Sequence, residues 1–430
     1  MSAGIIFLIF IISLFLSIPV AITLCIVAIL PGIVDPSFPA GIQLVIRSML
    51  GGVDSFPMLA VPMFILSGII MAHGGISKKL FNMFSYFIGN KTAGLPIAVI
   101  ITCLFYGAIS GSGPATTAAV GAMTIPILVA SGYDIVFATA LVAVAGGLGV
   151  IIPPSIPFIF YGMSSGTSVG KMFIAGIVPG LLIGLCLMAY AYYYCKKNGE
   201  DKEKLEANYQ AIRSVGFLGV FKDSFWALLS PIIILGSIYS GVASPTEAAT
   251  ISVYYSLFIS IFIYKTITVK DIPRMLVESV RTYAPILFII AAAIAFSRVL
   301  TFLQVPQQIV AGITTVFHGK IAILLITNIF FLFVGMVMDT TPAILILTPI
   351  LLPVMTAIGV DPVHFGIIMV VNLAIGFVTP PIGINLFVAS SVTGIEVMDI
   401  AKKAMPFIGA FILALLLITF IPEISLMLVN

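Results

Sequence analysis

The stretch Ser110-Gly111-Ser112-Gly113-Pro114-Ala115-Thr116-Thr117 lies in the middle of a segment without charged residues, between Lys91 and Asp134. A membrane span needs roughly 20 apolar residues, so this segment is too long for one span. The two glycines allow the chain to reverse, and Pro114 suits the first position of a new helix. We therefore expect two half-depth helices that meet at a glycine-rich tip, a re-entrant hairpin. Two full but short helices remain the alternative.

A second uncharged segment, residues 135–170, is also too long for one span and is also interrupted. Its middle reads Gly146-Gly147-Leu148-Gly149-Val150 and is followed by Pro153, Pro154 and Pro157. Glycine and proline at these positions disrupt a helix. We expect one span that is broken near the middle of the membrane.

The second half of the chain repeats both features. Gly107, Pro114 and Ala115 match Gly335, Pro342 and Ala343, each 228 residues later; at a spacing of 227, Pro126, Ala130, Gly132, Asp134, Gly149, Pro153, Pro154, Phe160 and Ser164 match Pro353, Ala357, Gly359, Asp361, Gly376, Pro380, Pro381, Phe387 and Ser391. The second tip reads Asp339-Thr340-Thr341-Pro342, and the second break reads Gly376-Phe377-Val378-Thr379-Pro380. An internal repeat of this kind is typical of transporter folds.

The composition places the whole chain in lipid. Of its 430 residues 61% are hydrophobic and 8% are charged, whereas soluble domains carry about 25% charged residues. The net charge of +3 is scattered and forms no basic block, so nucleic acid is not an expected partner. The cysteines lie singly, and His73, His318 and His364 are dispersed, so we expect neither an enzyme nor a transition-metal site.

Further spans are expected at 4–30, 55–73, 172–195, 224–243, 247–264 and 282–301. Residues 37–50 are expected to form a short helix that does not cross, 75–90 and 303–317 to form connecting helices, and 196–223 to form an aqueous loop. Ser244, Pro245 and Glu247 predict a capping box. Lysine-rich loops lie in the cytoplasm of bacteria, which places the N-terminus inside, the C-terminus outside and the two hairpins in opposite orientations. The expected fold class is therefore an all-α integral membrane protein with an inverted repeat, two re-entrant helical hairpins and two broken transmembrane helices.

Unwound backbone in a membrane requires a cavity, so we expect the two tips and the two breaks to surround one site. Carbonyl and hydroxyl oxygens at half-helix ends suit a bare monovalent cation, and half-helix N-termini attract an anion. We expect sodium site 1 at Ser110, Ser112, Gly147 and Val150, sodium site 2 at Gly335, Asp339, Thr340, Thr341, Gly376 and Thr379, and substrate contacts at Gly113, Thr116, Pro154, Ser155 and Pro381. Thr341 is a natural N-cap for the second hairpin's outgoing helix, and Asp339 either completes a sodium shell or caps the same helix. Titratable groups deep in the chain are scarce, which favours sodium over protons and calls for no other cofactor.

At these motifs the chain resembles the DctM-like large membrane subunit of tripartite ATP-independent periplasmic (TRAP) transporters. The resemblance rests on the Ser110–Thr117 tip, the stretch from Gly149 to Pro157, the run Ser244-Pro245-Thr246-Glu247-Ala248-Ala249 and the break at Thr379-Pro380-Pro381. It implies an elevator-type transporter in the bacterial inner membrane that takes up a small organic anion with sodium. It also implies a small four-helix membrane subunit, here expected as a separate chain, and a soluble periplasmic substrate-binding protein. Family substrates include C4-dicarboxylates and sialic acids, and the sialic-acid type is the one that this chain most resembles.

The resemblance also implies a division into a scaffold and a mobile transport domain. We expect a first scaffold and arm segment at 1–92, a first transport repeat at 93–170, a scaffold with the second arm at 171–319, a second transport repeat at 320–395 and a C-terminal scaffold helix at 396–430. Two other functions remain open: a stand-alone sodium–anion symporter that needs no binding protein, and a channel.

Overall fold

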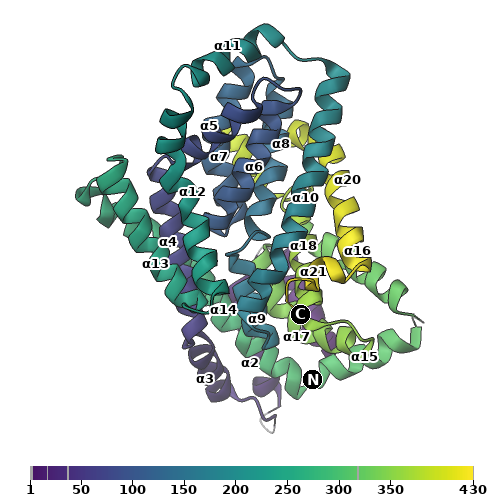
Figure 1. Cartoon of the computed structure of the whole chain (residues 1–430). Helices are drawn as coiled ribbons and strands as arrows, with labels where there is room; N and C mark the ends of the chain where they lie inside the picture. The colour runs from purple at the N-terminus through teal and green to yellow at the C-terminus, as the bar shows by residue number, and fades with distance from the viewer. Residues whose placement is uncertain (1–2, 17, 36–37, 317–318, 430) are drawn as a thin grey trace.

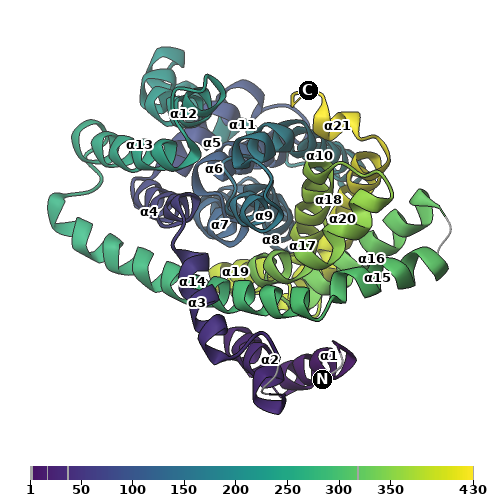
Figure 2. The same ribbon diagram turned by 90° about the horizontal axis from the view of Figure 1, so that it is seen from below.

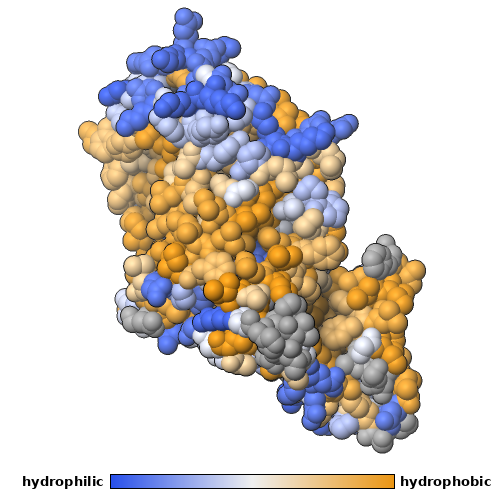
Figure 3. Space-filling view, turned by 90° about the vertical axis from the view of Figure 1, so that its right-hand side faces the viewer, coloured by the Kyte–Doolittle hydropathy of each residue, from blue (hydrophilic) through white to orange (hydrophobic). Residues whose placement is uncertain are grey.

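The computed structural model describes residues 3–16, 18–35, 38–316 and 319–429. All regular elements within these ranges are helical, and nine helices in them are long and apolar enough to span a membrane (Figure 1). Figure 3 shows a broad hydrophobic band beneath a hydrophilic cap at one end of the molecule. The expected fold class, an all-helical membrane protein with two hairpins and two broken helices, is confirmed.

The first hairpin consists of α6 (Gly94–Ser110) and α7 (Gly113–Ala130). Gly111 ends α6 with a φ of +61°, a conformation that glycine adopts without a steric penalty. The Ser112 hydroxyl caps α7 by accepting a hydrogen bond from Ala115 N at 3.4 Å. These two neighbouring residues reverse the chain, as the sequence predicts.

The first broken helix consists of α8 (Ile135–Gly146), a 3-10 turn η2 (Gly147–Val150) and α9 (Ile156–Ser165). Asp134 caps α8 by accepting a hydrogen bond from Phe137 N at 2.8 Å. The Ser155 hydroxyl caps α9 by accepting a bond from Phe158 N at 3.4 Å. The Ser155 cap lies at the break itself and satisfies an N–H group that the interrupted helix leaves free.

The second half of the chain forms the same four elements in the same order. They are α16 (Lys320–Val337), α17 (Thr340–Ala357), α18 (Pro362–Gly376) and α19 (Ile384–Thr393). Asp361 caps α18 as Asp134 caps α8, by accepting a bond from Val363 N at 2.7 Å. The prediction that Thr341 caps α17 is wrong, because Thr341 lies inside the helix. Asp339 takes the N-cap position and accepts a hydrogen bond from Thr340 N at 2.8 Å. The Asp339 carboxylate directly precedes the free N–H groups of the first turn, whereas the Thr341 hydroxyl, two residues later, already lies within that turn.

Two long helices, α10 (Val169–Asn198) and α20 (Val397–Phe420), pack against each other and against the repeat elements. α10 contacts α6, α9 and α18, and α20 contacts α8 and α18. The outer helices are α4 (Ala60–His73), preceded by η1 (Phe56–Leu59), α12 (Phe217–Tyr239), α13 (Pro245–Phe258), extended by a π-turn (Ile259–Ile263), and α14 (Ile272–Phe302). Which of these helices move with the hairpins, and hence the expected division into scaffold and transport domain, stays a prediction.

The N-terminal region differs from the expected single span at 4–30. It forms two helices, α1 (Ala3–Phe15) and α2 (Val20–Val34), that pack against each other. Pro19 explains the interruption, because it lacks an N–H and disfavours a helical conformation at the preceding residue. α3 (Ile42–Val53) has 12 residues, which extend about 18 Å and are too short to cross about 30 Å of hydrocarbon. The cytoplasmic position of the N-terminus stays a prediction.

The polar and connecting segments also form helices. α5 (Ile76–Ile88) and α15 (Val305–Val316) precede the two hairpins, and α11 (Lys202–Arg213) lies within the expected aqueous loop. The capping box at the start of α13 is confirmed, since Ser244 N donates to Glu247 Oε2 at 2.7 Å and Glu247 N donates to Ser244 Oγ at 3.3 Å. Seen from below, α14 lies between the α1–α3 segment and the repeat helices α17 and α19 (Figure 2). α14 therefore separates the α1–α3 segment from the repeat helices and contacts α2, α3 and α17.

Candidate functional site

Each hairpin meets the break of its own repeat through a pair of glycines. A Cβ atom on Gly107 of α6 would lie 2.8 Å from the Cα of Gly149 in the first break. A Cβ on Gly335 of α16 would lie 3.2 Å from the Cα of Gly376 at the second break. Real Cβ atoms essentially never come within 3.0 Å of another atom, so the first contact requires glycine at Gly107. In the second contact a Cβ on Gly376 would lie 2.2 Å from the backbone carbon of Gly335, so glycine is required at Gly376. The two pairs are equivalent in the internal repeat, so both repeats use the same packing.

The first tip holds its hydroxyl groups directly against the first break. Ser110 Oγ and Thr116 Oγ1 lie 2.9 Å apart, and Thr116 Oγ1 donates to the carbonyl of Ser112 at 2.8 Å. A Cβ on Gly149 would lie 2.6 Å from this carbonyl. The Gly111 carbonyl accepts from Ile156 N at 3.3 Å. Carbonyl and hydroxyl oxygens therefore gather between the tip and the break, which is the type of ligand that sodium prefers.

The other members of expected sodium site 1 lie in the same break. Gly147 and Val150 are buried within η2. The Val150 carbonyl accepts from the Ser155 hydroxyl at 2.5 Å. A Cβ on Gly147 would point toward α20 and lie 3.4 Å from the Phe411 ring. The structure thus places the four residues in the tip and the break that meet at Gly107 and Gly149, and their role as sodium ligands stays a prediction.

The structure brings only some residues of expected sodium site 2 into contact. Gly335 and Gly376 are in contact, and Ile382 N donates to the carbonyl of Met336 at 3.3 Å, so the end of α16 touches the second break. Thr379 Oγ1 donates to the Ile375 carbonyl at 2.8 Å, one turn earlier in the same chain segment. Asp339 binds its neighbour Thr340, and Thr340 and Thr341 form the buried first turn of α17. Sodium binding at this site also stays a prediction.

The two repeats meet at the centre of the molecule. A Cβ on Gly113 of the first tip would lie 3.1 Å from the Phe377 ring of the second break. Asn385 at the start of α19 donates from Nδ2 to the carbonyl of Ala143 in α8 at 3.0 Å. The buried Oδ1 of Asn385 has no hydrogen-bond partner among the described residues. The sequence did not point to Asn385, because the equivalent residue of the first repeat is Phe158 and the two repeats therefore do not match at this position.

The expected substrate residues take different positions. Thr116 and Ser155 are fully buried, with their hydroxyls bonded to Ser112 and Val150. A Cβ on Gly111 would lie 2.9 Å from the Pro154 carbonyl, so Pro154 packs under the first tip, whereas Pro381 is exposed. The peptide bonds Pro153–Pro154 and Pro380–Pro381 are both cis. Substrate binding by these residues, and by Gly113, stays a prediction.

A cavity of about 490 Å³ lies beside the first tip. Ser110, Ser112 and Ala115 line it from the hairpin, and α4 and α14 contribute the opposite wall. Sequence reasoning did not identify the wall residues on α4 and α14, because neither helix carries a break or a repeat motif.

Two of the three histidines have partners, His73 with Glu278 at 3.2 Å and His364 with Ser425 at 3.2 Å, while His318 lies outside the described residues.

Comparison with known proteins extends this description. A family model described as "Tripartite ATP-independent periplasmic transporter, DctM component" matches residues 7–424. The isethionate TRAP transporter permease protein DctMQ of Oleidesulfovibrio alaskensis is 43% identical over 97% of this chain, and the chain spans 65% of the length of that protein. The C4-dicarboxylate TRAP transporter large permease protein DctM of Pseudomonas aeruginosa is 41% identical over 88% of this chain and 87% of its own length.

The sialic acid TRAP transporter large permease protein SiaM of Vibrio cholerae is 34% identical over 96% of this chain and 95% of that protein. Among solved structures, MtrF of Neisseria gonorrhoeae, described as illuminating a class of antimetabolite efflux pumps, matches with a TM-score of 0.62. That match covers 89% of this chain and 84% of MtrF at 12% identity, so it shows the fold alone. The family match covers nearly the whole chain, and two of these relatives match it over almost their full length. The chain therefore belongs to the DctM component family of tripartite ATP-independent periplasmic transporters, as a large membrane subunit of the DctM type.

Proposed function

We propose that this multi-pass membrane protein carries out sodium-coupled, secondary active uptake of a small organic anion across the bacterial inner membrane. The observation that carries the proposal is the repeated contact of a hairpin with the break of its own repeat, at Gly107 and Gly149 and again at Gly335 and Gly376. At the first tip the hydroxyls of Ser110 and Thr116 lie beside the Ser112 carbonyl, and at the second break the Thr379 hydroxyl lies beside the Ile375 carbonyl. Oxygens of these kinds support the proposal because they replace the hydration shell of a sodium ion. Movement of the two hairpins as one elevator-like body is part of the proposal.

The substrate is proposed only as a class. The relatives are named for isethionate, for C4-dicarboxylates and for sialic acid, which are all small organic anions. The relative named for sialic acid is 34% identical and the one named for a C4-dicarboxylate is 41% identical, so identity does not favour the sialic-acid type. Half-helix N-termini at α7 and α17 supply partial positive charge for a carboxylate or a sulfonate.

Uptake is expected to require two partners, a small membrane subunit and a periplasmic substrate-binding protein. The purified chain should be reconstituted in proteoliposomes with and without these partners and supplied with radiolabelled succinate, N-acetylneuraminate or isethionate under a sodium gradient. We expect concentrative uptake of at least one acid only with all components present. Equal uptake by this chain alone would favour a stand-alone symporter, and uptake that only equilibrates the acid would favour a channel.

Two hydroxyls are expected to tune the sodium dependence. Ser112→Ala removes a hydroxyl from the first tip, and Thr379→Ala removes one from the second break. Losing one coordinating or hydrogen-bonding group costs about 1–3 kcal/mol, so each variant should raise the sodium concentration for half-maximal uptake roughly fivefold or more. The affinity for the transported acid at saturating sodium should change much less.

Matched controls are available for both changes. Thr356 lies exposed on α17 and donates to the Leu352 carbonyl at 3.0 Å, the same type of bond that Thr379 makes. Ser391 lies exposed on α19 and donates to the Val388 carbonyl at 2.7 Å. Thr356→Ala and Ser391→Ala should leave the sodium titration unchanged. If Ser112→Ala and Thr379→Ala also leave it unchanged, these hydroxyls only pack helices.

A further inference from the structure

Asn385, near the start of α19, is bonded to elements of both repeats. Its backbone N–H donates to the carbonyl of Phe377 in the second break at 2.9 Å, and its side-chain Nδ2 donates to the carbonyl of Ala143 in α8 at 3.0 Å. All three residues are buried, and α19 packs against both α7 and α8. One residue therefore links the second break to the helix that leads into the first break.

The Ala143 carbonyl lies where α8 tightens into the first break. In a regular α-helix the Gly147 N–H would donate to the carbonyl of Ala143. Here it donates to the carbonyl of Val144, because the chain enters the 3-10 turn η2. The Asn385 amide supplies a donor to Ala143 from the other repeat. Asn385 therefore holds the end of α8 next to Gly147, an expected member of sodium site 1.

The Phe377 carbonyl lies inside the second break, between two expected members of sodium site 2. Gly376 directly precedes it, and Thr379 N donates to the Gly376 carbonyl at 3.2 Å. The Phe377 ring packs against the first tip, since a Cβ on Gly113 would lie 3.1 Å from it. The second break is thus bonded to the end of α8 through Asn385 and packed against the first tip through Phe377.

Within the residues that the structure describes, the first repeat has no counterpart of this link between the breaks. Val150 is the equivalent of Phe377, and its carbonyl accepts from the Ser155 hydroxyl of its own repeat at 2.5 Å. Phe158 is the equivalent of Asn385 and carries no polar group on its side chain. The bonded connection between the two breaks therefore depends on one side chain and not on a symmetric pair.

We propose that Asn385 is a positioning residue that couples the two sodium sites. This inference rests on the proposed function. Sodium that orders the second break fixes the Phe377 carbonyl and with it Asn385, whose amide then holds the end of α8 in the position that the first site requires. Ordering one break thus lowers the cost of ordering the other, so an ion at either site raises the affinity of the other site.

The test follows the two breaks separately by hydrogen–deuterium exchange and mass spectrometry of the complete transporter complex in lipid nanodiscs. Peptides that cover residues 146–152 and 376–382 report on the first and the second break. Sodium replaces potassium stepwise at constant total salt. The sodium concentration that gives half of the full protection against exchange is the midpoint of each break. Thr379→Ala perturbs the second site, and Ser112→Ala perturbs the first.

In the parent chain, Thr379→Ala should raise the midpoints of both breaks together, by roughly fivefold or more. In the Asn385→Leu background, Thr379→Ala should raise the midpoint of the second break alone, and the first break should respond by less than about twofold. Ser112→Ala should give the reciprocal result, because coupling between two sites acts equally in both directions. A purely structural role of Asn385 would weaken both sites but leave the joint response intact.

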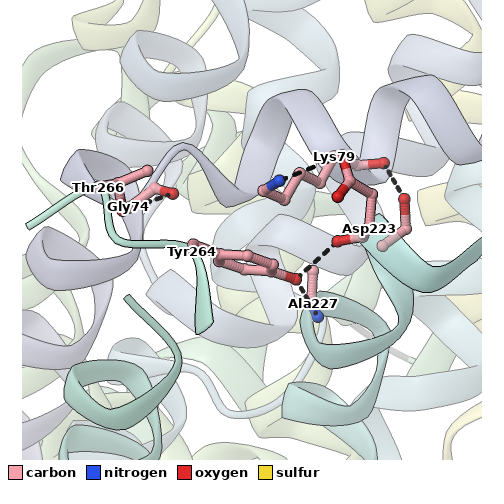
Figure 4. Close-up of polar contacts among 7 residues, drawn as sticks. Gly74, Lys79, Asp223, Ala227, Tyr264 and Thr266 are labelled. Atoms are coloured by element: carbon pink, nitrogen blue, oxygen red, sulfur yellow. Dashed lines mark hydrogen bonds and ion pairs between the residues drawn. The ribbon is translucent and has the colours of Figure 1, made fainter. Parts of the chain in front are cut away.

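Two control variants each remove a tyrosine hydroxyl that joins separate elements. Tyr161→Phe removes the bond from the Tyr161 hydroxyl to the Pro362 carbonyl at 2.5 Å, which also joins the repeats but lies at the start of α18, away from the breaks. Tyr264→Phe acts outside the repeats, where the hydroxyl donates to the Asp223 carbonyl at 2.9 Å and accepts from Ala227 N at 3.1 Å (Figure 4). Both controls should keep the joint shift of the two midpoints.

Asn385→Leu should fold, because the Oδ1 of Asn385 has no partner among the described residues and the variant removes this unsatisfied buried acceptor. Its melting temperature should therefore stay near that of the parent. If the variant does not fold, Asn385→Ala, which also lacks the amide, takes its place in the same titrations.

A first break that still follows Thr379→Ala in the Asn385→Leu background would overturn the role of Asn385. The coupling would then belong to packing at Gly147, where an added Cβ would lie 3.5 Å from the Ala374 carbonyl. Loss of the joint shift in the tyrosine controls as well, or its absence from the parent, would also overturn the role. Failure of the proposed function is distinct: in the parent, sodium would then protect neither break, or neither Thr379→Ala nor Ser112→Ala would move a midpoint, and the inference would fall with the sodium sites.

Discussion

Replacing sodium by potassium on both sides of the membrane should reduce uptake to the background rate, the largest effect that we expect from any change of conditions. The physical reason lies in the two tips, where hydroxyls and carbonyls gather and titratable side chains are scarce. Asp339 is the one carboxylate of either tip, and it is occupied as the N-cap of α17. At the first tip the hydroxyls of Ser110 and Thr116 lie 2.9 Å apart, and Thr116 donates to the Ser112 carbonyl at 2.8 Å, so oxygens are the groups that this tip offers to a coupling ion.

The measurement is initial uptake by the reconstituted complex with succinate, N-acetylneuraminate and isethionate as probes. One set of vesicles receives an inward sodium gradient, and the other receives potassium with an imposed proton gradient of equal size. We expect uptake only in the first set, with a rate that rises steeply with the sodium concentration. Equal rates in the two sets would show that the transporter is coupled to protons, and the sodium sites proposed above would then be wrong.

Gly376→Ala should abolish uptake and destabilise the protein. A Cβ at this position meets the backbone carbon, oxygen and Cα of Gly335, each nearer than real Cβ atoms approach. No flexible side chain is available to give way, so the end of α18 must move away from α16. Overpacking a tight core costs about 1–3 kcal/mol, and a clash with backbone lies at the upper end of that range. The displaced break would also lose its position against the end of α16, on which the proposed coupling depends.

The control for this prediction is Gly409→Ala on the exposed face of α20, where an added Cβ meets nothing within 4 Å. Alanine exceeds glycine in helix propensity by about 1 kcal/mol, so this variant should be as stable as the parent or more so. Thermal unfolding in detergent, followed by the monodisperse peak in size-exclusion chromatography, gives the stability, and vesicle uptake gives the activity. A Gly376→Ala protein that melts and transports like the parent would refute the close contact of the second hairpin with the second break.

The N-terminal region is interrupted at Pro19, although its apolar pattern is uniform. Residues 4–30 are uncharged throughout, and this uniform hydropathy favoured one long helix. Pro19 nevertheless divides the segment into α1 and α2. A proline inside an apolar run is tolerated in some helices here, such as α10 at Pro179 and α14 at Pro285. The neighbours that pack around each helix decide between a bend and a break.

The sequence by itself determined the hairpins, the broken helices and the repeat, because glycine, proline and capping residues act on the backbone within a few residues of their own position. Helix ends at Gly111, Ser112 and Asp134 are set by these residues themselves and do not depend on how the rest of the chain packs. Only the tertiary structure decided which surfaces meet. The bond from Asn385 to Ala143 and the pairing of His73 with Glu278 join residues more than 200 positions apart. Such contacts depend on how whole helices pack and leave no periodic or local mark in the sequence, so the cavity wall on α4 and α14 emerged only when the chain was folded.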